Sequence, residues 1–265
     1  MNFVGHPTAE QVTEYCRQAW VSKKPPHANF TFFQHYREEE GLFLDIGAHA
    51  GQSVAYLAQT LPRVSMVAFE PNPLFQPCRD FLLAQLPGRL TWYDFAVGAE
   101  ATTAQLHVPR VSGNVTFAPT VATPLGPSSR ASLSERQVQK GGVLDSLKRH
   151  REDPVIEFEH LEVPVKSVDA LGLLPRFAKI DVEGFEFEVL QGMRQTLARS
   201  MPILMIEKNE HEPVIAFLES IDYQSFSYIE GALYPFHIRP DVNDIFFLSA
   251  RDVASLQSHG LHLKS

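Results

Sequence analysis

An apolar run that ends in a glycine-containing turn occupies residues 41–53, GLFLDIGAHAGQS. The run Gly41–Ile46 is short, apolar and closed by glycines, which is typical of a buried parallel strand. After the turn, apolar residues recur at spacings of three and four, which predicts one buried face of a helix: Val54, Leu57, Ala58 and Leu61. This stretch therefore predicts the first strand–turn–helix unit of an α/β fold.

The same alternation of strand and helix continues along the chain. Further strands are expected at 64–70, 90–97, 177–182, 203–207, 223–229 and 244–249, with helices at 75–86, 189–197 and 214–221. Strands that alternate with helices build a mostly parallel sheet with helices on both faces. The last two strands are close enough in sequence to form an antiparallel edge. The predicted fold class is therefore α/β.

Two segments depart from this alternation. Residues 1–40 are expected to form an N-terminal helical extension or lid, in which Thr8 caps a helix through Trp20. Residues 41–265 form the main domain, with an insertion at about 99–166 in which 103–108 and 157–166 pair as a hairpin. The aromatic residues of the extension either staple it to the core or line a lid over a site: Phe30, Phe32, Phe33 and Tyr36.

A long loop lies within that insertion, at residues 109–142. It is rich in Pro, Gly and Ser, and it carries four basic residues against one acid: Arg110, Arg130, Arg136 and Lys140. A loop of this length inside a compact domain is usually functional or disordered. It is interpreted either as a lid that meets an anionic acceptor or as a plain solvated loop.

The composition argues against several classes of protein. The 265 residues carry a net charge of −8, whereas nucleic-acid binding usually needs a basic face that neutralises phosphates. The two cysteines, Cys16 and Cys78, form neither a zinc motif nor a disulfide framework. No apolar run is long enough for a membrane span, and the first residues lack the pattern of a signal peptide. We expect a cytoplasmic protein without nucleic-acid or membrane partners, and a homo-oligomer remains open.

Ligands of open α/β sheets bind at the carboxyl ends of the strands. The first predicted strand ends at Asp45, and the turn that follows contains Gly47 and Gly51, which let the backbone approach a ligand closely. This glycine spacing differs from the G-x-G-x-x-G pattern, and an acid here repels a pyrophosphate, so an NAD(P)-linked oxidoreductase is the weaker hypothesis. An acid at this position suits a cationic ligand, such as one with an amino group and a sulfonium.

The next two strand ends predict a nucleoside site. Glu70 ends the second predicted strand, where a carboxylate can accept hydrogen bonds from both hydroxyls of a ribose. The third strand end, at Asp94, Phe95 and Ala96, is expected to lie beside an adenine, with Asp94 or a backbone amide bonded to the ring.

The fourth and fifth strand ends carry acids. Asp181 and Glu183 follow the fourth strand, and Glu207 ends the fifth strand shortly before Asn209 and His211. Asp181, Glu207 or His211 is the expected general base for a substrate hydroxyl. The same side chains offer ligands for Mg²⁺ or Mn²⁺, so a divalent metal is the alternative, and it is not the favoured one.

Together these motifs resemble the FkbM family of S-adenosylmethionine-dependent methyltransferases. The resemblance rests on five pieces in order: Asp45–Ser53, Phe69–Pro73, Ala96–Gly98, Lys179–Glu186 with Val189, Leu190 and Gly192, and Pro202–Glu207. It implies a class I methyltransferase fold, which is a Rossmann-like, seven-stranded, mostly parallel sheet whose last strand is antiparallel. Position 49 departs from the family pattern, because His stands where most relatives have Asn.

The resemblance also implies a cofactor site and a reaction. Its residues would be Asp45, Gly47, Ala48, His49, Gly51 and Ser53 around the methionine, Glu70, Pro71 and Asn72 at the ribose, Asp94, Phe95 and Ala96 at the adenine, and Asp181. The implied reaction is O-methylation of a hydroxyl on a sugar or natural-product small molecule, with S-adenosylhomocysteine as the product. A methyltransferase-fold binding protein without catalysis is the alternative from another class.

Overall fold

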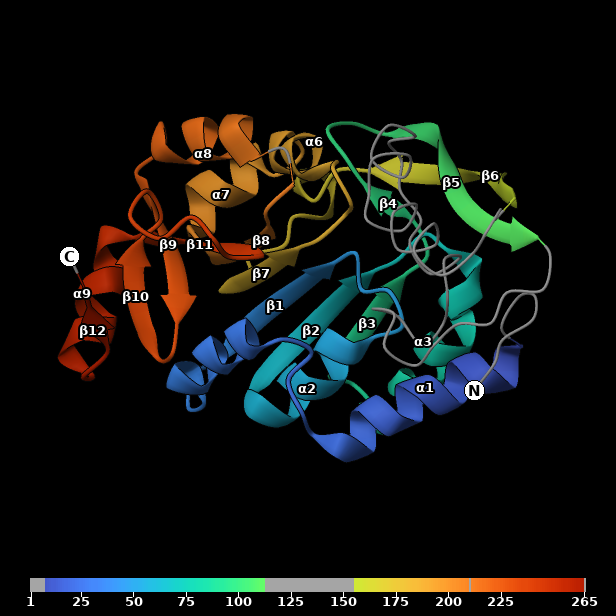
Figure 1. Cartoon of the computed structure of the whole chain (residues 1–265), viewed down its shortest axis with the longest axis horizontal. Helices are drawn as coiled ribbons and strands as arrows, with labels where there is room; N and C mark the ends of the chain where they lie inside the picture. The colour runs from blue at the N-terminus through green and yellow to red at the C-terminus, as the bar shows by residue number, and fades with distance from the viewer. Residues whose placement is uncertain (1–7, 113–154, 210, 265) are drawn as a thin grey trace.

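A nine-stranded sheet forms the centre of the molecule in the computed structural model, which describes residues 8–112, 155–209 and 211–264 (Figure 1). Its strands are β1 Gly41–Ile46, β2 Val64–Phe69, β3 Leu90–Tyr93, β7 Phe177–Ile180, β8 Ile203–Glu207, β9 Tyr223–Ile229, β10 Ala232–Pro235, β11 Asp244–Ser249 and β12 His262–Leu263. They are arranged in the order β12-β10-β9-β11-β8-β7-β1-β2-β3. The predicted α/β class is confirmed.

The parallel part of the sheet follows from the apolar strand sequences. Strands β3, β2, β1, β7 and β8 pair in parallel, and β11 enters antiparallel between β8 and β9. The order β3-β2-β1-β7-β8-β11-β9 therefore gives the seven expected strands with one antiparallel member. Of these seven strands, β11 is the last along the chain, and it is not at the edge because β9 lies outside it.

The expectation of seven strands was too low by two. A tight turn at Glu230 and Gly231, both with positive φ, folds β10 back onto β9. The end of the chain then adds β12 beside β10. With these two short strands the sheet has nine strands, and the hydrogen-bonding edge of β9 is covered.

The predicted strand at 90–97 is two strands in different sheets. Its first half is β3, whereas β4 Ala96–Val97 pairs with β6 Val155–Lys166 in a second sheet of order β4-β6-β5. In this sheet β5 Thr102–Ser112 and β6 pair antiparallel along their whole length, which confirms the predicted hairpin. Residues 113–142 of the long loop, with Arg130, Arg136 and Lys140, lie outside the described residues, as does the side chain of Arg110.

Helices cover both faces of the large sheet, as Figure 1 shows. One face carries α1 Ala9–Ser22, α2 Gln52–Thr60, α3 Gln76–Gln85, the 3₁₀ helix η1 Ala28–Tyr36 and α9 Ala250–Ser258, which share one apolar core. The other face carries α6 Glu186–Gln191, α7 Arg194–Ser200 and α8 His211–Glu219 over a second core. The single helix expected at 189–197 is thus two helices. They divide at Gly192, where a side chain would meet the Gly98 carbonyl oxygen at 2.0 Å.

The N-terminal segment packs on the same core as the sheet. Thr8 caps α1 as expected, through a reciprocal pair of hydrogen bonds with Gln11. The aromatic residues of η1 are buried, and Phe32 and Phe33 contact the rings of Phe246 and Phe43 on central strands. Such burial of large rings is worth roughly 1.5–3 kcal/mol per side chain and holds the segment against the sheet.

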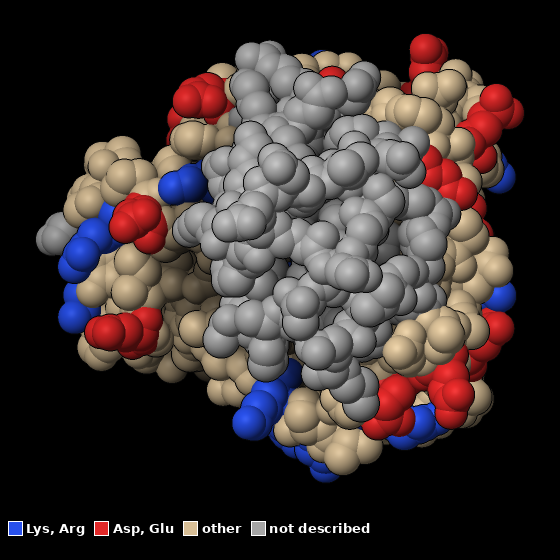
Figure 2. Space-filling model, turned by 45° about the vertical axis from the view of Figure 1, so that its right-hand side comes forward, with Lys and Arg blue, Asp and Glu red and all other residues tan. Residues whose placement is uncertain are grey.

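One face of the described surface can be examined for basic charge in Figure 2. On the face drawn in Figure 2, Lys and Arg side chains are mixed with Asp and Glu around the rim, and the described atoms form no continuous basic area. Among the helices of the described ranges, none combines the length and the apolar character needed to cross a membrane.

Candidate active site

The turn after β1 brings two strand ends into close contact. Gly47 has a φ of +82°, and a Cβ at this position would lie 1.8 Å from the carbonyl oxygen of Asp181. The amides of Gly47 and Ala48 both donate to the carbonyl of Phe69, at 3.0 Å each. Glycine is required here because a side chain would separate the ends of β1 and β7.

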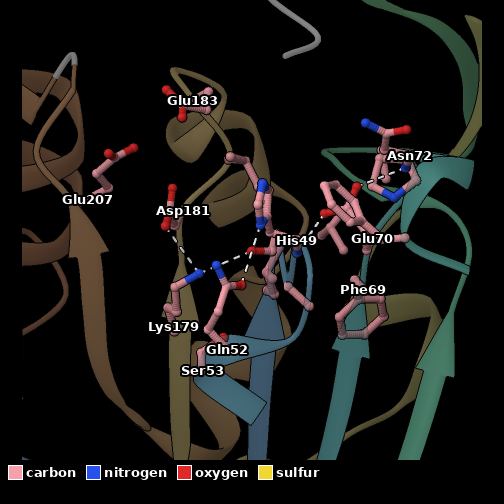
Figure 3. A pocket seen from close by; sticks show the side chains of 18 of the residues that line it. His49, Gln52, Ser53, Phe69, Glu70, Asn72, Lys179, Asp181, Glu183 and Glu207 are labelled. Carbon is pink, nitrogen blue, oxygen red and sulfur yellow. Dashed lines mark hydrogen bonds and ion pairs between the residues drawn. The ribbon is translucent and has the colours of Figure 1, made fainter. Parts of the chain in front are cut away.

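A cavity of about 310 Å³ opens at these strand ends. Its lining includes most of the residues predicted for a site: Gly47, Ala48, His49, Ser53, Glu70, Pro71, Asn72, Phe95, Ala96, Asp181 and Glu207. In Figure 3, Glu70 and Asn72 lie on one side, Asp181, Glu183 and Glu207 on the other, and His49 between them. The fold therefore brings the predicted nucleoside end and the predicted acidic end into one cavity.

Four predicted site residues do not line this cavity. Gly51 begins α2 with a φ of +75° and packs against Leu82, so its role is to shape the turn. Asp94 points to Arg79, with which it forms an ion pair. Its neighbours Phe95 and Ala96 line the cavity instead, because the chain bends at residues 94 and 95 between β3 and β4.

His211 and Asp45 are the other two predicted residues that do not line the cavity. The His211 ring hydrogen-bonds the Asn209 carbonyl oxygen at 3.2 Å and packs on Phe236, on the first turn of α8. The Asp45 carboxylate is buried beneath the cavity, where it accepts a hydrogen bond from Ser53 and pairs with Lys179. Lys179 is its register partner on β7, so the negative charge of Asp45 is balanced within the protein.

Glu70 is held by backbone amides at the end of β2. Its two carboxylate oxygens accept hydrogen bonds from the amides of His49 and Asn72, each at 2.8 Å. Burial raises the pKa of Glu70 to about 7, although these two bonds act in the opposite direction. A carboxylate fixed in this way retains lone pairs that can accept two adjacent hydroxyls of a ligand.

His49 lies in the middle of the cavity with a φ of +54°. Asn, Asp and His are the non-glycine residues that tolerate this left-handed conformation best, so His fits the backbone of this turn. The ring packs on Phe75 with centroids 4.2 Å apart, and Nδ1 lies 3.3 Å from Gln52 Oε1. Gln52 in turn donates to the Tyr15 hydroxyl of α1 at 2.8 Å.

Lys179 is a buried cation that the sequence reasoning missed. Its Nζ lies 3.4 Å from Asp45 Oδ1 and 3.2 Å from Asp181 Oδ2, and it donates to the Gly47 carbonyl oxygen at 3.0 Å (Figure 3). Burial alone would lower the pKa of Lys179, but the two carboxylates outweigh it and raise the pKa. A lysine inside the apolar strand FAKI was the available signal, because an unpaired charge is almost never buried.

The acids at the other side of the cavity differ in protonation. Burial would raise the pKa of Asp181, but the Lys179 ammonium outweighs this and lowers it, so Asp181 is a carboxylate. Burial and the neighbouring Asp181 carboxylate raise the pKa of Glu207. Carboxylate oxygens of Asp181, Glu183 and Glu207 lie within 4.8 Å of one another, so these three residues could also hold a divalent cation.

The N-terminal segment contributes to the lining of the cavity, and of the four aromatic residues that were interpreted as a staple or a lid, Phe30 lies there. Tyr15, Pro26, His27 and Phe30 line it together with the strand ends. Nothing in the spacing of these residues connects them with the turn after β1. Asn29 fixes this part of the chain, because its amide donates to the Asp244 carboxylate of β11 at 2.9 Å.

A protein-family model and several solved structures match this chain. A model of the methyltransferase FkbM domain matches residues 45–225, more than half of the chain. Among solved structures, the methyltransferase FkbM of Methylobacillus flagellatus KT is 17% identical, with a TM-score of 0.49 over 78% of this chain and 43% of that one. The chain thus spans less than half the length of that protein.

Two further solved structures are similar over most of both chains. The precorrin-6y C5,15-methyltransferase of Geobacter metallireducens GS-15 is 13% identical, with a TM-score of 0.40 over 82% of this chain and 84% of that one. An rRNA methylase of Streptococcus thermophilus is 11% identical, with a TM-score of 0.39 over 84% and 94%. No curated protein sequence matches the chain.

Proposed function

Because the chain belongs to the FkbM methyltransferase family, we propose that its cavity binds S-adenosylmethionine and that the protein methylates a hydroxyl of a sugar or natural-product small molecule. The observation that carries the proposal is the single cavity with Glu70 at one side and Asp181 at the other. Family membership argues against the NAD(P)-linked alternative.

The residues present fit the cofactor. Glu70 would accept the two ribose hydroxyls, since both of its oxygens are fixed by backbone amides and face the cavity. Phe69 and Phe95, whose ring centroids are 5.6 Å apart, would border the adenine. The cavity volume falls at the lower end of the usual range for small-molecule sites, about 300–1,000 Å³.

S-Adenosylmethionine supplies an electrophilic methyl group, and the protein has to orient and activate the acceptor. Holding two reactants in line can contribute about 7–11 kcal/mol to lowering the barrier. Asp181 is the proposed general base, because Lys179 keeps it ionised and it lines the cavity. Glu207, whose raised pKa favours the protonated form, would donate a hydrogen bond to the acceptor.

The first test is a calorimetric titration of the protein with S-adenosylhomocysteine, with NADH as the matched control ligand. Micromolar binding of S-adenosylhomocysteine and no binding of NADH are expected. Binding of NADH alone would contradict the proposal. Methyl transfer to simple glycosides, followed by mass spectrometry, then separates an enzyme from a binding protein of the same fold.

The affinity for S-adenosylhomocysteine is expected to depend on pH through Glu70. Above its pKa of about 7 the carboxylate can accept both ribose hydroxyls, whereas protonation below that value converts one oxygen into a donor. The dissociation constant should therefore rise as the pH falls from 8 to 6, by up to about tenfold per unit below 7 for one linked proton. In Glu70→Gln, the affinity should be weak and nearly flat over this range. An equally steep pH dependence in the variant would show that another group titrates.

A further inference from the structure

Two histidines face each other across the hairpin of the second sheet. His107 in β5 and His160 in β6 are direct partners in the antiparallel register, so their side chains project from the same face. Their Nδ1 atoms are 3.0 Å apart, and their ring centroids are 4.9 Å apart with the planes nearly perpendicular. His107 is buried, whereas His160 is exposed to solvent.

The separation of the two nitrogens limits what can lie between them. Two imidazole nitrogens at 3.0 Å either share one proton in a hydrogen bond or bind one common cation. With metal–nitrogen bonds of about 2.0–2.1 Å, this separation corresponds to an angle of about 95° at the metal. That angle is close to the right angle of square-planar and octahedral complexes, and smaller than the tetrahedral angle that zinc sites adopt.

We propose that His107 and His160 form a two-histidine site for a divalent transition metal of the Cu²⁺ or Ni²⁺ type. Imidazole ligands suit these metals, and square-planar or tetragonal geometry is characteristic of both. Solvent has access through His160, so water completes the coordination. Among the described residues no third His, Cys, Asp or Glu joins the pair, so the protein supplies two ligands; Gln105 and Glu162 form the next exposed pair on the same face.

The site is separate from the proposed methyltransferase cavity. Leu106 lines the cavity, and since neighbouring strand residues point to opposite faces, His107 points away from it. The acids of the cavity are oxygen ligands that favour Mg²⁺ or Mn²⁺, whereas the imidazole pair favours Cu²⁺ or Ni²⁺. A metal at the pair would join β5 to β6 at the position where the hairpin meets the cavity.

Titration of the untagged protein with Cu²⁺, buffered by excess glycine to suppress weak sites, tests the proposal. The variants are His160→Ala, in which the exposed ligand is removed, and His107→Gln. His259→Ala is the matched control, because His259 is exposed in α9's C-terminal turn and bonds Ser255 of its own helix. Wild type and control are expected to bind one Cu²⁺ tightly, with a pulsed electron paramagnetic resonance spectrum that shows the remote nitrogens of two imidazole ligands, which glycine lacks.

Both pair variants are expected to lose that Cu²⁺ or to bind it at least 100-fold more weakly. Thermal unfolding gives a second measurement: one equivalent of Cu²⁺ should raise the Tm of wild type and of the control, and not that of His160→Ala. The proposal is overturned if His160→Ala binds Cu²⁺ as wild type does. It is equally overturned if wild type binds none, because the pair is then a hydrogen bond only.

Discussion

Replacing Lys179 with methionine is expected to lower the free energy of unfolding by about 3–5 kcal/mol, the usual cost of removing one partner from a buried ion pair. The Lys179 ammonium lies between the buried Asp45 carboxylate and Asp181, and it also bonds the Gly47 carbonyl oxygen. Methionine fills a similar volume, so the loss of charge rather than a cavity would cause the effect. Chemical denaturation at pH 7, followed by circular dichroism, measures it.

A control and a rescue make this test specific. Lys208→Met removes a lysine whose Nζ donates to the Pro240 carbonyl oxygen near the surface, and it should cost less than about 1 kcal/mol. Adding Asp45→Asn to Lys179→Met should restore part of the stability, because the neutral amide needs no buried cation. Equal stabilities of Lys179→Met and wild type would show that Lys179 is not the charge that balances these carboxylates.

Replacing Asp181 with asparagine is expected to reduce kcat by about 10²–10⁴-fold, the range attributed to a general base. Asparagine keeps the size and a hydrogen-bonding oxygen but cannot accept the proton. The Kd for S-adenosylhomocysteine should change little, because the proposed ribose contacts are made by Glu70 on the other side of the cavity. Single-turnover methyl transfer and calorimetry on the same preparation separate these two quantities.

Two variants serve as references for Asp181→Asn. Glu207→Gln should retain most of the turnover, because the raised pKa makes Glu207 a protonated acid that glutamine imitates. His211→Ala should retain turnover as well, since His211 bonds the Asn209 carbonyl oxygen outside the cavity lining. If Glu207→Gln is the variant that loses turnover while Asp181→Asn is active, the assignment of the base is reversed.

The sequence predicted the path of the backbone well. Apolar strand runs and helical spacing identified seven of the nine strands of the large sheet, because the core accepts only residues with the right period. The sequence also indicated a position where the backbone requires glycine and a carboxylate at the end of a strand. Gly47 is a turn residue that no side chain could replace, and Glu70 follows directly from the end of an apolar strand. The many prolines, glycines and serines likewise indicated the long loop at residues 109–142.

The local backbone conformation decides which residues at the strand ends line the cavity. Which way a residue there faces depends on the local path of the backbone, and at residues 94 and 95 the chain bends instead of continuing as a strand. Asp94 turns to Arg79 while Phe95 turns to the cavity, and no spacing rule distinguishes the two in advance. The same bend divides the expected strand 90–97 between two sheets.

The sequence by itself determined the α/β architecture, the order of strand and helix, and the strand ends at which acids and glycines gather. Only the tertiary structure decided that Asp45 pairs with Lys179, 134 residues away, that Tyr15 reaches Gln52, and that His107 meets His160. The periodicity of apolar residues in helices and strands involves residues that are close in sequence, so it can be recognised in the sequence itself. Which charges and rings meet depends on packing between segments that are distant in sequence, and that information exists only once the sheet has formed.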